Sequence, residues 1–121
     1  NNLVKQVLEK ASDVNGVKVV SLSGVRVPDV VKNVAFGVRA ASNERTVFVA
    51  ATVDMQGKPL LTVMLTDDLV KEGLNASNIV REAAKLIKGG GGGQPGFAQA
   101  GGKDKEGIGA AAQKMRELLA L

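Results

Sequence analysis

Two near-continuous apolar segments, separated by only six residues, place the strongest constraint on how this 121-residue chain folds. They cover residues 46–53 and 60–65. Apolar runs without polar alternation are typical of central strands that are covered on both faces. The connection between them contains Gly57 and Pro59, which favour a turn. The sequence therefore predicts two antiparallel strands, joined as a hairpin, at the centre of a sheet.

A third strand and two helices are predicted before this hairpin. Residues 17–22 are rich in β-branched side chains, and Pro28 begins a helical pattern that continues to residue 41. A strand–helix–strand crossover makes its two strands parallel, so the sheet is mixed. One-sided apolar spacing also predicts an N-terminal helix over residues 2–13, which Asn15-Gly16 ends. We predict a single compact α/β domain, a two-layer sandwich in which a mixed β-sheet is packed with helices.

The C-terminal part predicts two further helices around a glycine-rich loop. One helical stripe ends near Lys88, and a second predicts a final helix over residues 105–120. Between them, residues 89–102 contain five consecutive glycines. Such a run is either a flexible linker or an ordered loop. Its neighbours are amphipathic helices and Phe97 lies within it, which favours an ordered loop.

Composition excludes several classes of site. The chain has no Cys and no His, which removes thiolate and imidazole ligands and most nucleophile–base pairs. We therefore predict no catalytic residue and no metal site. No run approaches the roughly 18 apolar residues of a membrane helix, so no membrane partner is expected. The lack of Cys favours a reducing compartment, and we expect a cytoplasmic protein. Because the chain does not begin with Met, we expect a fragment of a longer one.

Positive charge is concentrated near the glycine-rich loop. Residues 81–121 hold seven Lys or Arg against four Asp or Glu, whereas residues 1–80 hold nine against eight. Lys85, Lys88 and Lys103 flank the loop. They are either phosphate contacts or solvated cations at helix ends, and their spacing leaves both interpretations open. The loop lacks the Lys-Ser/Thr pair of a phosphate-binding loop, so ATP binding is not predicted here.

The glycine-rich segment also carries a family resemblance. Residues 91–102 resemble the glycine signature of the domain that ends alanyl-tRNA synthetases, which has three glycines, Arg or Lys, Pro, two variable residues, Ala-Gln and more glycines. The predicted strands, the turn at residues 66–70 and the helix ending at Lys88 follow in the family's order, so the resemblance covers nearly the whole chain. Gln94 stands where the pattern usually has a cation, and a neutral amide does not replace a cation at a phosphate.

This resemblance implies a C-terminal tRNA-binding domain over residues 1–121 that contacts the outer corner of alanine tRNA and helps aminoacylation and editing act on one tRNA. It implies a fragment without catalysis of its own. The parent would be an alanine–tRNA ligase whose ATP and zinc sites lie in parts absent from this chain, and its remaining domains would be partners. Together with the flanking lysines, the resemblance gives these candidate tRNA-binding residues: Lys85, Lys88, Gly91, Gly92, Gly93, Gln94, Pro95, Gln99, Gly101, Gly102 and Lys103.

Two other interpretations remain. A related domain accompanies DHH-type phosphoesterases and handles nucleic acid there, but its glycines are usually followed by a His that this chain lacks. A dimerisation domain is the second alternative, with Leu118, Leu119 and Leu121, or a region upstream, supplying a homodimer contact. Phe97 has two interpretations of its own, which are stacking on an unpaired RNA base and burial in the core.

Overall fold

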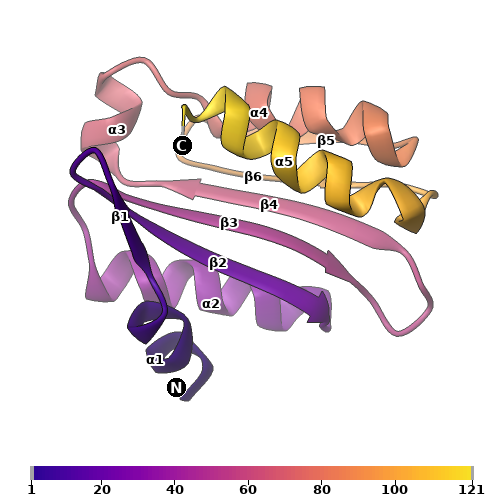
Figure 1. Ribbon diagram of the computed structural model, residues 1–121, viewed down its shortest axis with the longest axis horizontal. Helices are drawn as coiled ribbons and strands as arrows, with labels where there is room; N and C mark the ends of the chain where they lie inside the picture. Colours follow the sequence, from indigo (N-terminus) through magenta and orange to yellow (C-terminus); the bar gives the residue numbers. More distant parts are fainter. Residues whose placement is uncertain (1, 121) are drawn as a thin grey trace.

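The computed structural model describes residues 2–120 and contains a six-stranded sheet with the strand order β1-β2-β3-β4-β6-β5 (Figure 1). The strands are β1 (Ser12–Val14), β2 (Val17–Val25), β3 (Thr46–Val53), β4 (Pro59–Leu65), β5 (Gly90–Gln94) and β6 (Phe97–Gly101). The helices are α1 (Asn2–Glu9), α2 (Pro28–Ala41), α3 (Asp67–Lys71), α4 (Ala76–Ala84) and α5 (Ile108–Leu118), with short 3-10 turns η1 (Lys85–Ile87) and η2 (Lys105–Gly107).

The central strands pair as their apolar runs predict. β2 and β3 are parallel because α2 crosses over between them, and β3 and β4 are antiparallel because a short turn connects them. The sheet is therefore mixed, and the predicted α/β class with one compact domain is confirmed.

Helices cover both faces of this sheet (Figure 1). Alternate residues of β3 divide between two cores: Phe48 packs with α1 and α2, whereas Val47 and Val49 pack with α4 and α5. The sheet is thus the middle of three layers, where a two-layer arrangement was predicted. The physical reason lies in the same apolar runs, because a strand that is apolar on both sides needs a covering layer on each.

The N-terminal helix is shorter than its predicted range of 2–13. It ends at Glu9, and β1 follows as a short edge strand paired with β2. Asn15 and Gly16 have φ angles of 53° and 83°, so they form the turn between two strands and not the end of a helix. Two adjacent residues with positive φ are what a tight hairpin turn requires, and Asn-Gly supplies them readily.

The predicted loop at residues 89–102 is an ordered hairpin made of β5 and β6. Its turn is held on two sides: the Gly96 carbonyl accepts a hydrogen bond from the Leu65 amide at 2.8 Å, and the Pro95 carbonyl accepts one from the Ala76 amide at 2.8 Å. The final helix is also shorter than the predicted 105–120, because η2 precedes α5 and α5 ends at Leu118.

Candidate nucleic-acid interface

At four positions in and beside the β5–β6 hairpin, only glycine fits, because neighbouring atoms occupy the place of a Cβ atom. A Cβ atom on Gly89, Gly91 or Gly93 would collide with the backbone of β6 or the residue after it, and one on Gly102 would collide with Ile87. At Gly93, for example, the nearest atom would be the Phe97 carbonyl oxygen at 2.7 Å. The glycine run therefore lets strands and helix end approach more closely than side chains would allow.

Helix α4 packs against β5, which is the strand at the edge of the sheet. The Gly93 amide donates a hydrogen bond to Ser77 Oγ at 3.3 Å, and Arg81 Nη2 donates to the same oxygen at 2.9 Å. Ser77 is therefore bonded to the hairpin and to Arg81, and the side chain that caps α4 is that of Asn75, which accepts a hydrogen bond from the Asn78 amide. These contacts attach the edge strand β5 to α4, so the hairpin is part of the fold and not a tether.

Gly90 and Gly101 are different, because packing does not explain them. They pair with each other across the hairpin, and both are exposed. A Cβ atom on Gly90 would meet nothing within 4 Å, and one on Gly101 would lie 3.9 Å from the Pro59 carbonyl oxygen. Bare backbone at an exposed position allows a ligand to come close.

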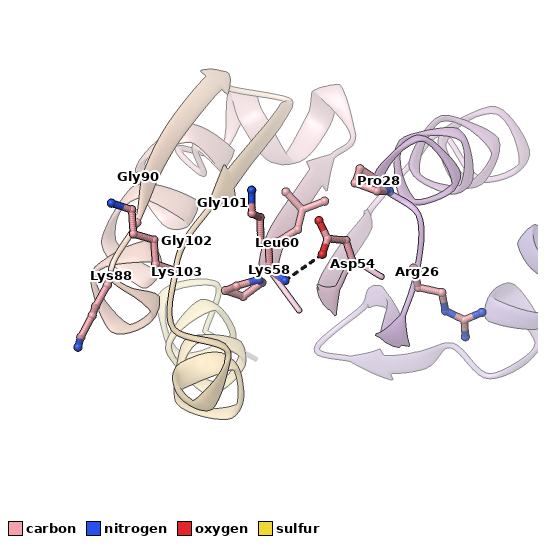
Figure 2. Close-up of a pocket in the computed structure, with 12 residues that line it drawn as sticks. Arg26, Pro28, Asp54, Lys58, Leu60, Lys88, Gly90, Gly101, Gly102 and Lys103 are labelled. Carbon is pink, nitrogen blue, oxygen red and sulfur yellow. Dashed lines mark hydrogen bonds between the residues drawn. The ribbon is translucent and has the colours of Figure 1, made fainter. Parts of the chain in front are cut away.

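These two glycines border a surface cavity of about 540 Å³ at the base of the hairpin. Figure 2 shows Lys88 and Arg26 at opposite sides of it, with Lys58 and Asp54 between them. The lining residues are Arg26, Pro28, Asp54, Lys58, Pro59, Leu60, Lys88, Gly89, Gly90, Gly101, Gly102 and Lys103, which we call the basic cavity. It has four cationic side chains and one carboxylate. That carboxylate, Asp54, already accepts hydrogen bonds from the backbone amides of Gln56 and Lys58, at 2.8 and 2.9 Å.

Strand register brings these distant residues together. Val25 pairs with Val53, which pairs with Pro59, so the ends of β2 and β3 and the start of β4 meet at one edge. The Arg26 amide then donates to the Val53 carbonyl at 2.9 Å. On the hairpin side, the Lys103 amide donates to the Ile87 carbonyl at 2.9 Å, which places Lys103 beside the end of η1.

The structure divides the predicted tRNA-binding residues into groups. Lys88, Gly101, Gly102 and Lys103 line the basic cavity, whereas Lys85 lies outside it and forms an ion pair with Glu82 at 3.2 Å. The members elsewhere on the hairpin are Gly91, Gly92 and Gly93 along β5, Gln94 and Pro95 at the tip, and Gln99 on β6, whose amide donates to Thr62 Oγ1 at 3.1 Å.

Sequence reasoning missed Arg26 and Lys58. They are placed by the register of β2, β3 and β4, since both residues lie directly beyond the end of an observed strand at the same edge of the sheet.

A second cavity lies at the tip of the same hairpin. It measures about 450 Å³, and its lining is Phe36, Arg39, Asp67, Val70, Gln94, Pro95, Gly96 and Phe97, which we call the aromatic cavity. Phe97 is half-buried against the α2 core, and its ring centroid lies 4.9 Å from that of Phe36. Phe97 is therefore only partly buried, because it packs against the core and still lines a surface cavity, and its stacking on an RNA base stays a prediction.

Metal-ligand clusters, membrane-spanning helices and an apolar dimer surface were the other features considered from the sequence. Within residues 2–120, no group of three or more acidic residues is arranged to hold a metal ion. None of the helices described there has the length and apolarity to cross a membrane. Of the leucines considered for a homodimer contact, Leu118 is partly exposed, Leu119 is buried in the core, and Leu121 lies outside the described residues.

Comparison with known proteins gives consistent matches. Residues 15–121 match the family model described as the DHHA1 domain. The chain is 50% identical over 117 residues to an alanine–tRNA ligase of Bacteroides thetaiotaomicron, and 39% identical over 116 residues to that of Myxococcus xanthus. These alignments cover 97% and 95% of this chain but 13% of each relative, so the chain spans a small part of their length.

Two solved structures are similar as well. The C-Ala domain of Aquifex aeolicus alanyl-tRNA synthetase superposes with a TM-score of 0.77 at 25% identity, covering 92% of this chain and 98% of that domain. A DHH-domain structure superposes with a TM-score of 0.59 at 15% identity, covering 99% of this chain and 30% of that protein, which shows a shared fold alone.

Proposed function

Because this chain belongs to the DHHA1 domain family, among the C-terminal domains of alanyl-tRNA synthetases, we propose that it binds tRNA through the basic cavity. The parent would be an alanine–tRNA ligase, with ATP and zinc bound by other domains. The RNA region contacted would be the outer corner of alanine tRNA. The fragment itself supplies binding and no chemical step.

One observation carries this proposal: four cationic residues and exposed glycine backbone line the same concave surface. Arg26, Lys58, Lys88 and Lys103 come from three separate parts of the chain, and the only carboxylate of the lining, Asp54, is already bonded to backbone amides. Cations placed this way neutralise phosphates and release their counterions. The exposed Gly90 and Gly101 allow an RNA backbone to approach without steric conflict.

A weak contact of this kind is sufficient for the proposed role. Once the catalytic domains of the parent hold one end of a tRNA, a tethered second domain meets the other end at high local concentration. The domain would thereby help aminoacylation and editing act on the same tRNA.

The test is a titration with alanine tRNA, a tRNA with an altered corner and an unrelated RNA duplex, each over a series of salt concentrations. We expect tightest binding to the intact tRNA. Lys88→Ala/Lys103→Ala should weaken binding and reduce the slope of log K against log salt by roughly one per lost phosphate contact.

The matched control is Lys5→Ala/Lys71→Ala, which removes the same charge from exposed lysines outside the basic cavity. An equal change of slope in both double variants would show a nonspecific charge effect and contradict the proposed site. Failure of the wild-type chain to prefer the intact tRNA over the duplex would contradict the proposed function.

A further inference from the structure

The aromatic cavity at the hairpin tip combines features that the basic cavity lacks. The chain has three Phe and no Trp or Tyr, yet two of those Phe residues meet at this surface. Phe36 remains 42% exposed although it projects from a helix that could bury it. Its ring and that of Phe97 are inclined by 36°, which gives a continuous apolar platform at a solvent-facing position.

Arg39 is fixed beside this platform. Its Nη2 donates to the Leu65 carbonyl at 3.2 Å and lies 3.5 Å from Asp67 Oδ1. A Cβ atom on Gly96 would lie only 2.9 Å from the same nitrogen, so the glycine at the turn makes room for the guanidinium group. The cavity therefore has an immobilised planar cation at one side and the Gln94 amide near the turn.

The charges of the lining decide which part of an RNA fits. The only cation of this cavity, Arg39, has the Asp67 carboxylate 3.5 Å away, and a negative charge beside it disfavours a phosphate. A nucleobase is different, because its ring stacks on aromatic side chains while its edge bonds to amide, carboxylate and guanidinium groups. The lining provides all of these groups.

We propose that the aromatic cavity binds one unpaired nucleobase of the RNA whose phosphates occupy the basic cavity, with Phe36 as the stacking side chain. This proposal rests on the proposed function. The two cavities lie at opposite ends of β5 and β6, and a five-residue strand spans about 17 Å. One RNA can therefore contact both, with its backbone at the hairpin base and an unstacked base at the tip.

Fluorine NMR tests the contact directly, because 4-fluorophenylalanine labels three positions, of which Phe48 is fully buried and serves as an internal reference. The ligands are a stem–loop RNA with unpaired loop nucleotides and a fully paired duplex of equal length. We expect the Phe36 resonance to shift with the stem–loop and to stay in place with the duplex, while the Phe48 resonance is unchanged by both.

Affinity measurements separate this proposal from the previous one. Phe36→Leu keeps an apolar side chain but removes the aromatic face, so binding of the stem–loop should weaken about 5- to 100-fold with an unchanged salt slope. Val30→Ala is the matched control, since Val30 is an exposed apolar residue of α2 outside the cavity. Thermal unfolding of both variants reports whether the fold is retained.

The outcomes are distinct. If Phe36→Leu leaves stem–loop affinity unchanged while Lys88→Ala/Lys103→Ala weakens it, base stacking is rejected and phosphate binding stands. If the wild-type chain binds alanine tRNA but not the stem–loop, the nucleobase site is rejected and the proposed function stands, whereas failure to bind any of these RNAs rejects both proposals. Equal weakening by Phe36→Leu and Val30→Ala would also overturn the assigned cavity.

Discussion

The two hairpins of this domain are built by opposite means. In β3 and β4, large side chains such as Phe48 and Leu61 are fully buried between helix layers, and the pair is stabilised by what the side chains fill. In the second hairpin, four of the five residues of β5 are glycine, and β5 lies close to β6 because Gly89, Gly91 and Gly93 have no Cβ atom that would collide with the neighbouring backbone. In one part of the sheet the strand pairing thus depends on large buried side chains, and in the adjacent part it depends on the absence of side chains.

This difference also explains where the surface cavities lie. Helix α2 covers the central strands, but on the same face β6 presents only Phe97, Gln99 and Gly101, and β5 presents Gln94 and glycine backbone. A hairpin with so few side chains cannot fill the space at its ends, and both cavities form there. The surface is therefore open at both ends of the β5–β6 hairpin, whereas the core around β3 and β4 is filled with side chains.

The largest expected effect comes from removing atoms in the first hairpin. Leu61 is completely buried in the core of α4 and α5, so Leu61→Ala should lower the free energy of unfolding by about 2–5 kcal/mol. Urea denaturation followed by circular dichroism measures this loss. A decrease well below that range would show that the surrounding helices collapse into the space, and the contrast between the hairpins would then be weaker than proposed.

The second hairpin should respond to the addition of atoms. Gly91→Ala places a methyl group against the backbone of Ala100, and such overpacking costs about 1–3 kcal/mol. Gly90→Ala is the matched control in the same strand, because its methyl group meets open space and its effect on unfolding should be close to zero. Equal destabilisation by both substitutions would show that lack of space beside Gly91 does not explain its requirement for glycine.

The same difference between the hairpins explains which elements and which site residues could be predicted from the sequence. The segments of β3, β4 and α2 carry side-chain patterns with a period or an unbroken apolar run, so their predicted ranges agree with the structure to within one residue. Lys88 and Lys103 were grouped because both flank the glycine run, and the structure places both in the lining of one cavity.

The other elements and site residues had no such side-chain pattern in the sequence. A strand made of glycine has no side-chain alternation, so β5 was predicted as part of a loop. The Asn15-Gly16 pair fits a helix end as well as a hairpin turn, and only the pairing of β1 with β2 distinguishes them. Arg26 and Lys58 reach the basic cavity through strand register, which a single sequence without alignment leaves undetermined.

The smallest expected effect concerns an acidic residue that acts on the first hairpin alone. The Asp68 carboxylate accepts hydrogen bonds from Thr66 Oγ1 at 2.6 Å and from the Arg45 amide at 2.9 Å, which links the segments just outside β3 and β4. The Thr66 hydroxyl, with the backbone amides of Arg45 and Leu69, lowers the pKa of Asp68 below its ordinary value of 3.8, although burial opposes the shift. The strands β5 and β6 contain no titratable side chain.

A lowered pKa in the folded state means that the ionised carboxylate stabilises the fold above pH 3.8, and that this stabilisation is lost as the pH falls below that value. Asp68→Asn should therefore reduce the urea midpoint slightly at pH 6.5, and the difference from wild type should shrink at pH 3. Asp67→Asn is the control, because its carboxylate is 89% exposed and its 3.5 Å pair with Arg39 contributes little. A difference for Asp68→Asn that is equally large at both pH values would show that the shape of the side chain, and not its charge, holds these segments together.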